Sequence, residues 1–133
     1  MVDYKAQGKR NKAMGADFER RTRKDLEDKG WKVSKYSNNV DLMFQISKPA
    51  KPGRFRMMQT GFPDFIAYKL RFNNDIISGY EIQFVECKTN GYLSKEEKEK
   101  AKWYLDNNYC SKFLIAYKTK EKNRVKVNYK EFE

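Results

Sequence analysis

The sequence predicts an α/β domain in which helices pack on a mixed central β-sheet. Three observations support this fold class. Residues 12–29 repeat apolar side chains at helical spacing. Two runs rich in apolar and aromatic residues, 63–68 and 80–88, are separated by turn-forming residues and predict an antiparallel hairpin. A second helical segment, 94–107, precedes a continuous apolar run at 113–117 that is typical of a buried inner strand.

The chain begins with a polar, basic stretch, residues 1–11, which has no periodicity and predicts a loose arm. Such an arm either touches a nucleic acid backbone or simply frays. Its cations Lys9 and Arg10, together with Lys12, are therefore candidate DNA-binding residues.

The helix predicted over residues 12–29 has one face formed by Gly15, Glu19, Thr22 and Leu26, flanked by Met14 and Phe18. Gly30 is positioned to cap its C-terminus. Glu19 thus lies beside the apolar stripe, where a carboxylate needs a partner. A metal ion or its bound water would serve, and so would Arg20, Arg23 or another base at the helix margin; helical spacing favours neither.

Residues 31–36 alternate apolar and polar side chains and predict a half-buried first strand. Residues 37–62 predict a long loop, because Pro49, Pro52 and Gly53 break regular pairing. Its cations and aromatic ring are typical of a surface that tracks a nucleic acid backbone, although a solvated basic loop has the same composition. These residues are Lys48, Lys51, Arg54, Phe55 and Arg56.

The predicted hairpin gathers two acids and an amine. Residues 73–75 and 78–79 supply turn chemistry between its strands. Because strand side chains alternate, Glu86 and Lys88 share one face and Cys87 takes the other, while Asp64 opens the partner strand. Two converging carboxylates form a hard-oxygen site suited to Mg²⁺, and an adjacent ammonium can steady a water or an anionic transition state. This pattern indicates phosphodiester chemistry.

A turn at residues 89–91 leads to Ser94 and Glu97, whose spacing is that of a capping box. The helix that follows buries Ala101, Tyr104 and Leu105 and runs to about residue 107. Its row of Lys95, Lys98 and Lys102 either lines a phosphate path or forms an ordinary solvated face.

The C-terminal part predicts two more strands. The run 113–117 is expected to be an inner strand, 118–123 a charged turn, and 124–129 an edge strand protected by lysine. The predicted order is helix, three strands, helix and two strands, in one domain of 133 residues.

The net charge of +11 favours a polyanionic partner over simple solubility charge. Segments 1–30, 31–63, 64–93 and 94–133 carry formal charges of +3, +5, −1 and +4. Only the segment that holds the acidic pair is not basic. A short acidic segment within a basic chain is typical of an enzyme that binds a cation at its active site and phosphate backbones around it.

Several classes of protein are excluded by composition. The absence of histidine rules out a histidine-based nuclease, a Cys/His zinc finger and an HExxH protease. Two cysteines, Cys87 and Cys110, are too few for a disulfide scaffold and are expected to be reduced core residues. No apolar run is long enough to span a membrane, and the N-terminus lacks a signal peptide pattern. We therefore expect a cytoplasmic protein that works with DNA.

Pro63-Asp64 followed by Glu86-Cys87-Lys88 resembles the signature of the PD-(D/E)XK nuclease superfamily. The first helix, with Glu19, and the order of the later elements resemble archaeal-type Holliday junction resolvases over most of residues 12–129. The resemblance implies a restriction-endonuclease-like fold, a homodimer, and cleavage of branched DNA in recombination and repair with a 5′-phosphate left on the product.

The resemblance also implies a role for each matching position. Asp64, Glu86 and the main-chain carbonyl of Cys87 would hold Mg²⁺, for which Mn²⁺ may substitute, and Glu19 would contact the metal directly or through water. Lys88 would orient the attacking water. Ser34 or Ser37 would match a serine that some relatives place beside the scissile phosphate, which makes Ser37 a candidate DNA contact.

Two features depart from this pattern. The stretch before Pro63 is longer than in compact resolvases and contains Asp41, a rival for the metal-binding aspartate. Asp64 is favoured because it begins a strand that can pair with the strand of Glu86. The segment 88–94 also resembles virus-type replication-repair nucleases, so a flap, nick or single-strand nuclease of phage or mobile-element origin is the alternative. A third interpretation is a non-catalytic DNA-binding module. The presence of Asp64, Glu86 and Lys88 together argues against it.

Overall fold

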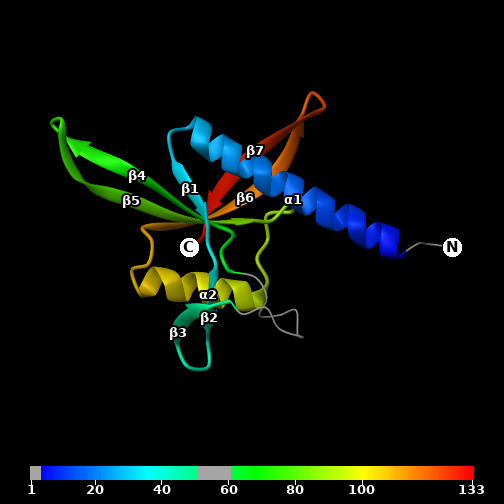
Figure 1. The fold of residues 1–133 in the computed structure, drawn as a ribbon, viewed down its shortest axis with the longest axis horizontal. Coiled ribbons are helices and arrows are strands. Elements are labelled where there is room, and N and C mark those ends of the chain that lie inside the picture. The colour runs from blue at the N-terminus through cyan, green and yellow to red at the C-terminus, as the bar shows by residue number, and fades with distance from the viewer. Residues whose placement is uncertain (1–3, 51–60) are drawn as a thin grey trace.

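The computed structural model describes residues 4–50 and 61–133 and has an α/β fold (Figure 1). A five-stranded mixed sheet has the strand order β1-β4-β5-β6-β7, and β2 and β3 form a separate two-stranded sheet. The elements are α1 (Tyr4–Asp28), β1 (Lys32–Lys35), β2 (Asn38–Asp41), β3 (Ile46–Pro49), β4 (Phe65–Asn73), β5 (Ile76–Cys87), α2 (Lys95–Asp106), β6 (Lys112–Glu121) and β7 (Arg124–Glu131).

The sheet is mixed because α2 carries the chain from β5 to β6 across one face. The β5 and β6 strands pair in parallel, whereas the pairs β1·β4, β4·β5 and β6·β7 are antiparallel. The predicted hairpin is therefore confirmed as β4 and β5, with Phe65 opposite Val85. The run 113–117 is confirmed as part of an inner strand, and β7 lies at the sheet edge.

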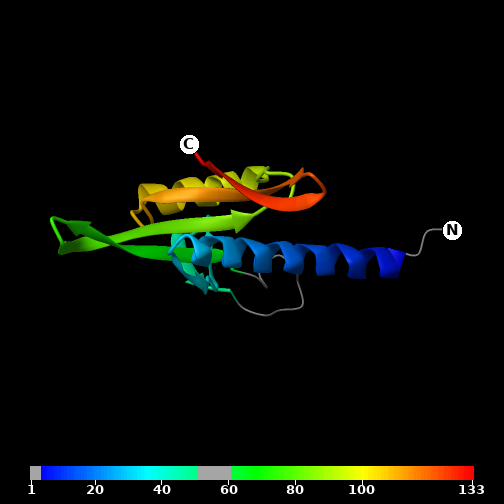
Figure 2. The same cartoon turned by 90° about the horizontal axis from the view of Figure 1, so that it is seen from above.

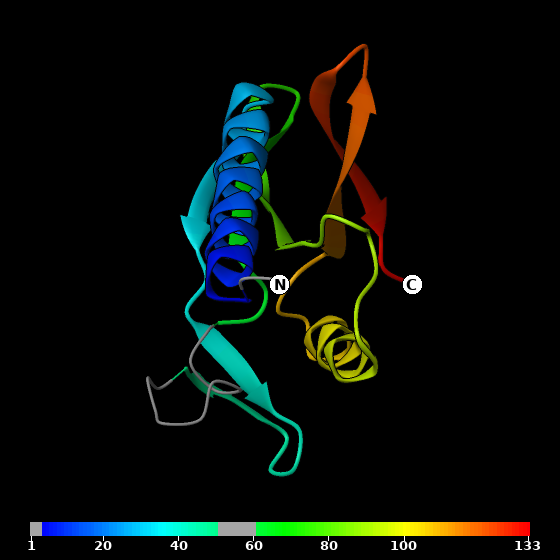
Figure 3. The ribbon, with the colours of Figure 1, turned by 90° about the vertical axis from the view of Figure 1, so that its right-hand side faces the viewer.

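Alternating side chains of the sheet form two cores, one beneath each helix (Figures 2 and 3). On one face, Phe18 and Leu26 of α1 pack with Val85 of β5. On the other, Tyr104 of α2 packs with Phe84 of β5, with their ring centroids 4.9 Å apart. The two helices thus cover opposite faces, and the C-terminal end of β5 lies between them.

The first helix begins earlier than predicted. Residues 4–11 belong to α1, so the expectation of a loose arm over residues 1–11 is wrong for the described part of that segment. The buried residues of α1 are Phe18, Thr22 and Leu26, which confirms the predicted stripe, while Met14 is exposed. Gly30 ends the helix with φ +92°, and the Trp31 N–H donates to Leu26 O.

The stretch predicted as a long loop contains a hairpin. In the described part of residues 37–62, β2 and β3 pair antiparallel, with Asn38 opposite Pro49. Pro49 is tolerated because it sits at the end of an edge strand. Asp41 holds the turn by accepting hydrogen bonds from the N–H groups of Met43 and Phe44.

Two predicted turns are shorter than expected. Asn74 and Asp75 make the turn between β4 and β5 with positive φ, whereas Gly79 lies within β5, near a register shift between Arg71 and Phe72. The charged segment 118–123 is mostly strand, and only its last two residues turn toward β7.

Cys87 and Cys110 are both free thiols, and Cys110 is buried while Cys87 is half-buried. Within residues 4–50 and 61–133, no helix is both long enough and apolar enough to cross a bilayer.

Candidate active site

Asp64 directly precedes β4, and backbone contacts of the residues around it fix its position. Its carbonyl accepts a hydrogen bond from the Tyr36 N–H at 3.0 Å. Two residues earlier, the Phe62 N–H donates to Asn38 O at 2.8 Å, and the Tyr104 hydroxyl donates to Phe62 O at 2.6 Å. The segment before β4 is therefore held by the start of β2 on one side and by α2 on the other.

Gly61 is required by this arrangement. A Cβ atom at position 61 would lie 2.2 Å from the carbonyl oxygen of Tyr36, closer than any side chain tolerates. The backbone that leads into Asp64 can pass this carbonyl only because residue 61 has no side chain.

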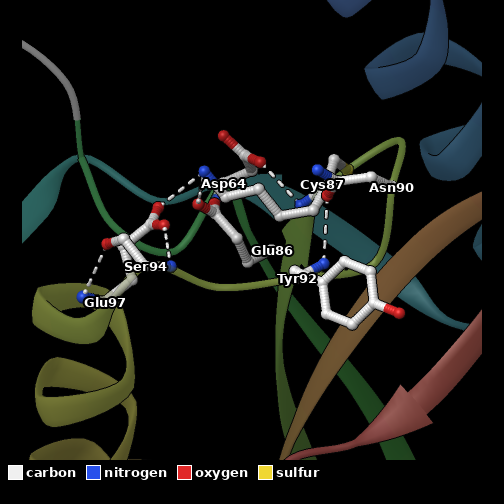
Figure 4. Close-up of polar contacts among 8 residues, drawn as sticks. Asp64, Glu86, Cys87, Asn90, Tyr92, Ser94 and Glu97 are labelled. Carbon is white, nitrogen blue, oxygen red and sulfur yellow. Dashed lines mark hydrogen bonds and ion pairs between the residues drawn. The ribbon is translucent and has the colours of Figure 1, made fainter.

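Asp64, Glu86 and Cys87 are joined by two hydrogen bonds that run in opposite directions (Figure 4). The Asp64 N–H donates to Glu86 Oε1 at 3.1 Å. The Cys87 N–H donates to Asp64 Oδ2 at 2.8 Å. The two carboxylates therefore meet where β4 begins and β5 ends, as alternation along the two strands predicts.

Glu86 is buried, at 6% relative exposure, and this burial raises its pKa well above the usual value. The neighbouring charge of Asp64 raises the pKa further, and Lys88 only partly opposes these effects. A buried acid beside a second acid is costly in its charged form. A cation bound at this position would offset both the burial of the Glu86 charge and its repulsion by Asp64.

Lys88 forms its shorter ion pair with Glu97 of α2. The Nζ atom lies 2.7 Å from Glu97 Oε2 and 3.9 Å from Glu86 Oε2. Half-burial by itself would lower the pKa of Lys88, but the hydrogen bond with Glu97 and the charges of Glu86 and Glu97 raise it. Lys88 is therefore held as a cation between the acidic pair and the start of α2.

The helix start that holds Glu97 is the predicted capping box, which is confirmed. The Glu97 N–H donates to Ser94 Oγ at 3.2 Å, and the Ser94 N–H donates back to Glu97 Oε1 at 2.9 Å. One carboxylate oxygen of Glu97 thus accepts the Ser94 N–H (Figure 4). The other oxygen pairs with Lys88. Sequence reasoning gave Glu97 only the capping role.

Glu19 faces the same region from α1. Burial raises the pKa of Glu19, and the charge of Asp64 raises it further, whereas Lys35 opposes the shift. Arg20 pairs with Asp17, and Arg23 with Glu27. The two arginines therefore have other partners, and the cation whose charge acts on Glu19 is Lys35, while Asp64 is the neighbouring acid.

These side chains line one cavity of about 460 Å³ between α1, α2 and the sheet. Its other lining residues include two buried polar side chains, Asn39 and Lys100, that sequence reasoning missed. Asn39 and Lys100 are buried polar residues, at 7% and 8% relative exposure, and Lys100 Nζ lies 3.4 Å from Glu96 Oε1. No motif singles them out, because only the fold brings β2 and α2 to this cavity. An adjoining hollow of about 220 Å³ is lined by Ser37, Lys35, Glu19 and Asp64.

The donor set fits a hard divalent cation. Among residues 4–50 and 61–133, no group of three or more His, Cys, Asp or Glu side chains is gathered closely enough to hold a metal ion. Mg²⁺, however, is typically bound by only one or two carboxylates, with water and phosphate oxygens completing its shell. The carboxylates of Asp64 and Glu86 lie together here, which is the number of acidic ligands that Mg²⁺ typically takes.

Asp41, the rival aspartate, is engaged elsewhere. Its Oδ2 lies 2.6 Å from Lys48 Nζ, and this hydrogen bond and those of its own turn lower the pKa of Asp41. Asp41 therefore serves the β2–β3 turn, while Asp64 lies beside Glu86.

The candidate DNA-binding residues are spread over several elements. Lys9, Arg10 and Lys12 are exposed on α1, and Ser37 lies in the wall of the smaller hollow. Lys48 is half-buried in its pair with Asp41. Lys51, Arg54 and Arg56 lie outside the described residues. On α2, Lys95, Lys98 and Lys102 are exposed, and Lys102 pairs with Asp106.

Comparisons of this chain with protein-family models, with curated proteins and with solved structures find no match.

Proposed function

We propose that this protein is a metal-dependent, structure-selective DNA endonuclease with a restriction-endonuclease-like fold. The observation that carries the proposal is the pair of hydrogen bonds that tie Asp64, Glu86 and Cys87 together, with Lys88 at 3.9 Å from Glu86. A structural ion pair would not need two adjacent carboxylates whose repulsion and burial raise the pKa of Glu86. A phosphodiester hydrolase needs such a pair.

The donor set of Asp64, Glu86 and the Cys87 carbonyl would hold Mg²⁺ or Mn²⁺. The chemistry that such an ion supplies is polarisation of the scissile phosphate and a lowered pKa of the attacking water. Lys88, kept charged by Glu97 and Glu86, would orient that water and stabilise negative charge on the phosphate. Glu19, whose pKa is raised by burial and by the charge of Asp64, would contact the ion directly or through a bound water.

Exposed basic residues of α1 would add binding to DNA. The exposed cations Lys9, Arg10 and Lys12 follow the projecting half of α1 (Figures 1 and 2). Cations at this position add affinity for phosphate backbones without sequence preference. Contacts of this kind are consistent with an enzyme that selects its substrate by shape and not by base sequence.

Within this class we favour a Holliday junction resolvase that acts as a homodimer. A four-way junction is symmetric, and cutting two opposed strands requires two active sites related by a two-fold axis. A flap, nick or single-strand nuclease would use the same chemistry at a single site.

A substrate panel tests the proposal. The full chain is incubated with end-labelled four-way junction, flap and linear duplex at matched ionic strength, with Mg²⁺ or with EDTA, and product ends are mapped on every strand. Paired, symmetric nicks on the junction only, and only with Mg²⁺, are the expected result. Cleavage of the flap alone would show that the protein is a flap nuclease and not a resolvase. Tight binding of DNA without any cleavage would show that it is a non-catalytic DNA-binding module.

A further inference from the structure

The outer part of the β4–β5 hairpin projects from the body of the protein as a two-stranded ribbon (Figures 1 and 2). In the described structure, β1 pairs with β4 only as far as Tyr68, and β6 pairs with β5 only from Gln83 onward. Residues 69–81 therefore extend past both neighbouring strands and past Ile82, whose carbonyl accepts the Ser111 N–H. We call this segment the ribbon.

One face of the ribbon is apolar along its whole length. Tyr68 lies opposite Ile82, Leu70 opposite Tyr80, and Phe72 opposite Ile77, and directly opposed residues share a face. The exposed fractions of Leu70, Phe72, Ile77 and Tyr80 are 38%, 62%, 59% and 63%. A groove of about 480 Å³ is lined by Tyr68, Leu70, Phe72 and Tyr80 together with Gly30, Lys32 and Lys69.

The opposite face of the ribbon is polar and already engaged. Lys69 Nζ lies 3.1 Å from the carbonyl oxygen of Lys29 and rests over the Trp31 ring. Arg71 pairs with Glu81 at 3.0 Å. Arg71 thus lies on the face opposite Leu70 and Phe72. Lys69 and Lys32 line the groove beside Tyr68, and Lys32 shares a face with Tyr68, its partner across β1 and β4.

A two-stranded hairpin is marginal in water unless a further strand or helix packs on its apolar face. The area fits a second copy of this chain. Phe72 and Tyr80 together leave roughly 250 Å² exposed, taking about 200 Å² for a whole aromatic side chain. The aliphatic neighbours bring the patch to on the order of 500 Å², which is the apolar share of the about 800 Å² that each partner buries in a stable dimer.

We infer that the apolar face of the ribbon is a homodimer interface, in which two ribbons pack face to face about a two-fold axis. The face is self-complementary, because rings and aliphatic side chains alternate along it and no charge on its outer part would be repeated across the axis. This inference rests on the fold alone and is independent of the proposed phosphodiester chemistry.

The oligomeric state in solution, measured without DNA or metal, tests the inference. Sedimentation equilibrium of the full chain is expected to give twice the chain mass of 15.9 kDa at micromolar concentration. The double substitution Phe72→Ser and Ile77→Ser should weaken dimerisation by at least about 30-fold, as expected for central apolar anchors. The matched control is Met43→Ser with Phe44→Ser, which removes two side chains of 84% and 69% exposure from the β2–β3 turn and should leave the dimer unchanged.

Amide hydrogen exchange supplies a readout that does not depend on a variant that folds. In the wild-type chain, protection of residues 70–80 should increase with protein concentration, while protection elsewhere in the described sheet should not. A chain that stays monomeric at 100 µM overturns the inference, and so does a dimer that the ribbon substitutions leave intact. Loss of duplex or vesicle binding in the ribbon variant of a monomeric chain would assign the face to DNA or lipid and would equally overturn it.

Discussion

Lys88 Nζ and Glu97 Oε2 lie 2.7 Å apart, although Lys88 directly follows β5 and Glu97 lies in the first turn of α2. The contact links the predicted water-orienting amine to the N-terminus of a helix. Because the second oxygen of Glu97 accepts the Ser94 N–H, the carboxylate cannot rotate freely. Lys88 is therefore positioned by secondary structure and not by the acidic pair alone.

Substitution of Glu97 by Gln should lower the pKa of Lys88. Gln keeps the capping box, since its side-chain oxygen still accepts the Ser94 N–H, but the charge that raises the lysine pKa is removed. Side-chain NMR titration of the lysine amines measures this change directly. Glu99→Gln, at an exposed position of the same helix, is the control. An unchanged Lys88 pKa in Glu97→Gln would show that the ion pair does not form in solution.

Replacement of Glu86 by Gln should stabilise the fold at neutral pH by about 1 kcal/mol. Burial raises the pKa of Glu86, so the folded state binds its proton more tightly than the unfolded chain does. The stability from this group is complete below the unfolded value of about 4.3 and is lost as pH rises through the raised folded pKa. Gln mimics the protonated acid at every pH.

Urea denaturation of both proteins between pH 5 and pH 8 checks this sign. The difference in unfolding free energy between Glu86→Gln and wild type should grow with increasing pH. A difference that shrinks with increasing pH would mean that the carboxylate is stabilised in the fold, contrary to the buried acidic pair.

Mg²⁺ or Mn²⁺ should raise the thermal unfolding midpoint of the wild-type protein. Binding to the folded state alone adds about 2.7 kcal/mol when the free ion is at one hundred times its dissociation constant. The effect should strengthen as pH rises, because Glu86 must lose its proton to bind the cation. Glu86→Gln should show little shift. An equal shift in both proteins would place the bound cation elsewhere.

Gly61→Ala should destabilise the fold by about 2 kcal/mol or more, because the new methyl group would collide with the Tyr36 carbonyl. The matched control is Gly15→Ala in α1, where a Cβ meets nothing within 4 Å and should add about 0.5–1 kcal/mol of stability. Denaturant midpoints of the two variants should move in opposite directions. Similar midpoints would show that the segment before Asp64 is not constrained as described.

Local signals in the sequence were sufficient to predict the elements that frame the site. Gly30 and the Ser94–Glu97 capping box mark helix ends through contacts within a few residues, so their effect is readable without a fold. The start of α1 was missed because residues 4–11 have no apolar stripe, and helical amphipathicity is the signal on which such a prediction depends.

Contacts that depend on tertiary packing could not be predicted. Alternation placed Glu86 and Lys88 on one face, yet the approach of Glu97 depends on how α2 docks against the sheet. Likewise, Lys100 and Asn39 reach the cavity only because α2 and β2 pack beside the segment 61–64. The β2–β3 hairpin was hidden by Pro49, which the end of a short edge strand tolerates.

Single-turnover cleavage of a labelled four-way junction, at protein concentrations that saturate binding, tests the central claim most directly. With Mg²⁺, Asp64→Asn and Glu86→Gln should each cut at least about 1000-fold more slowly than wild type, a loss of about 4 kcal/mol in transition-state stabilisation. Asp41→Asn should cut at the wild-type rate, because Asp41 holds the β2–β3 turn. Wild-type cleavage by either site variant at unchanged junction affinity would contradict the account.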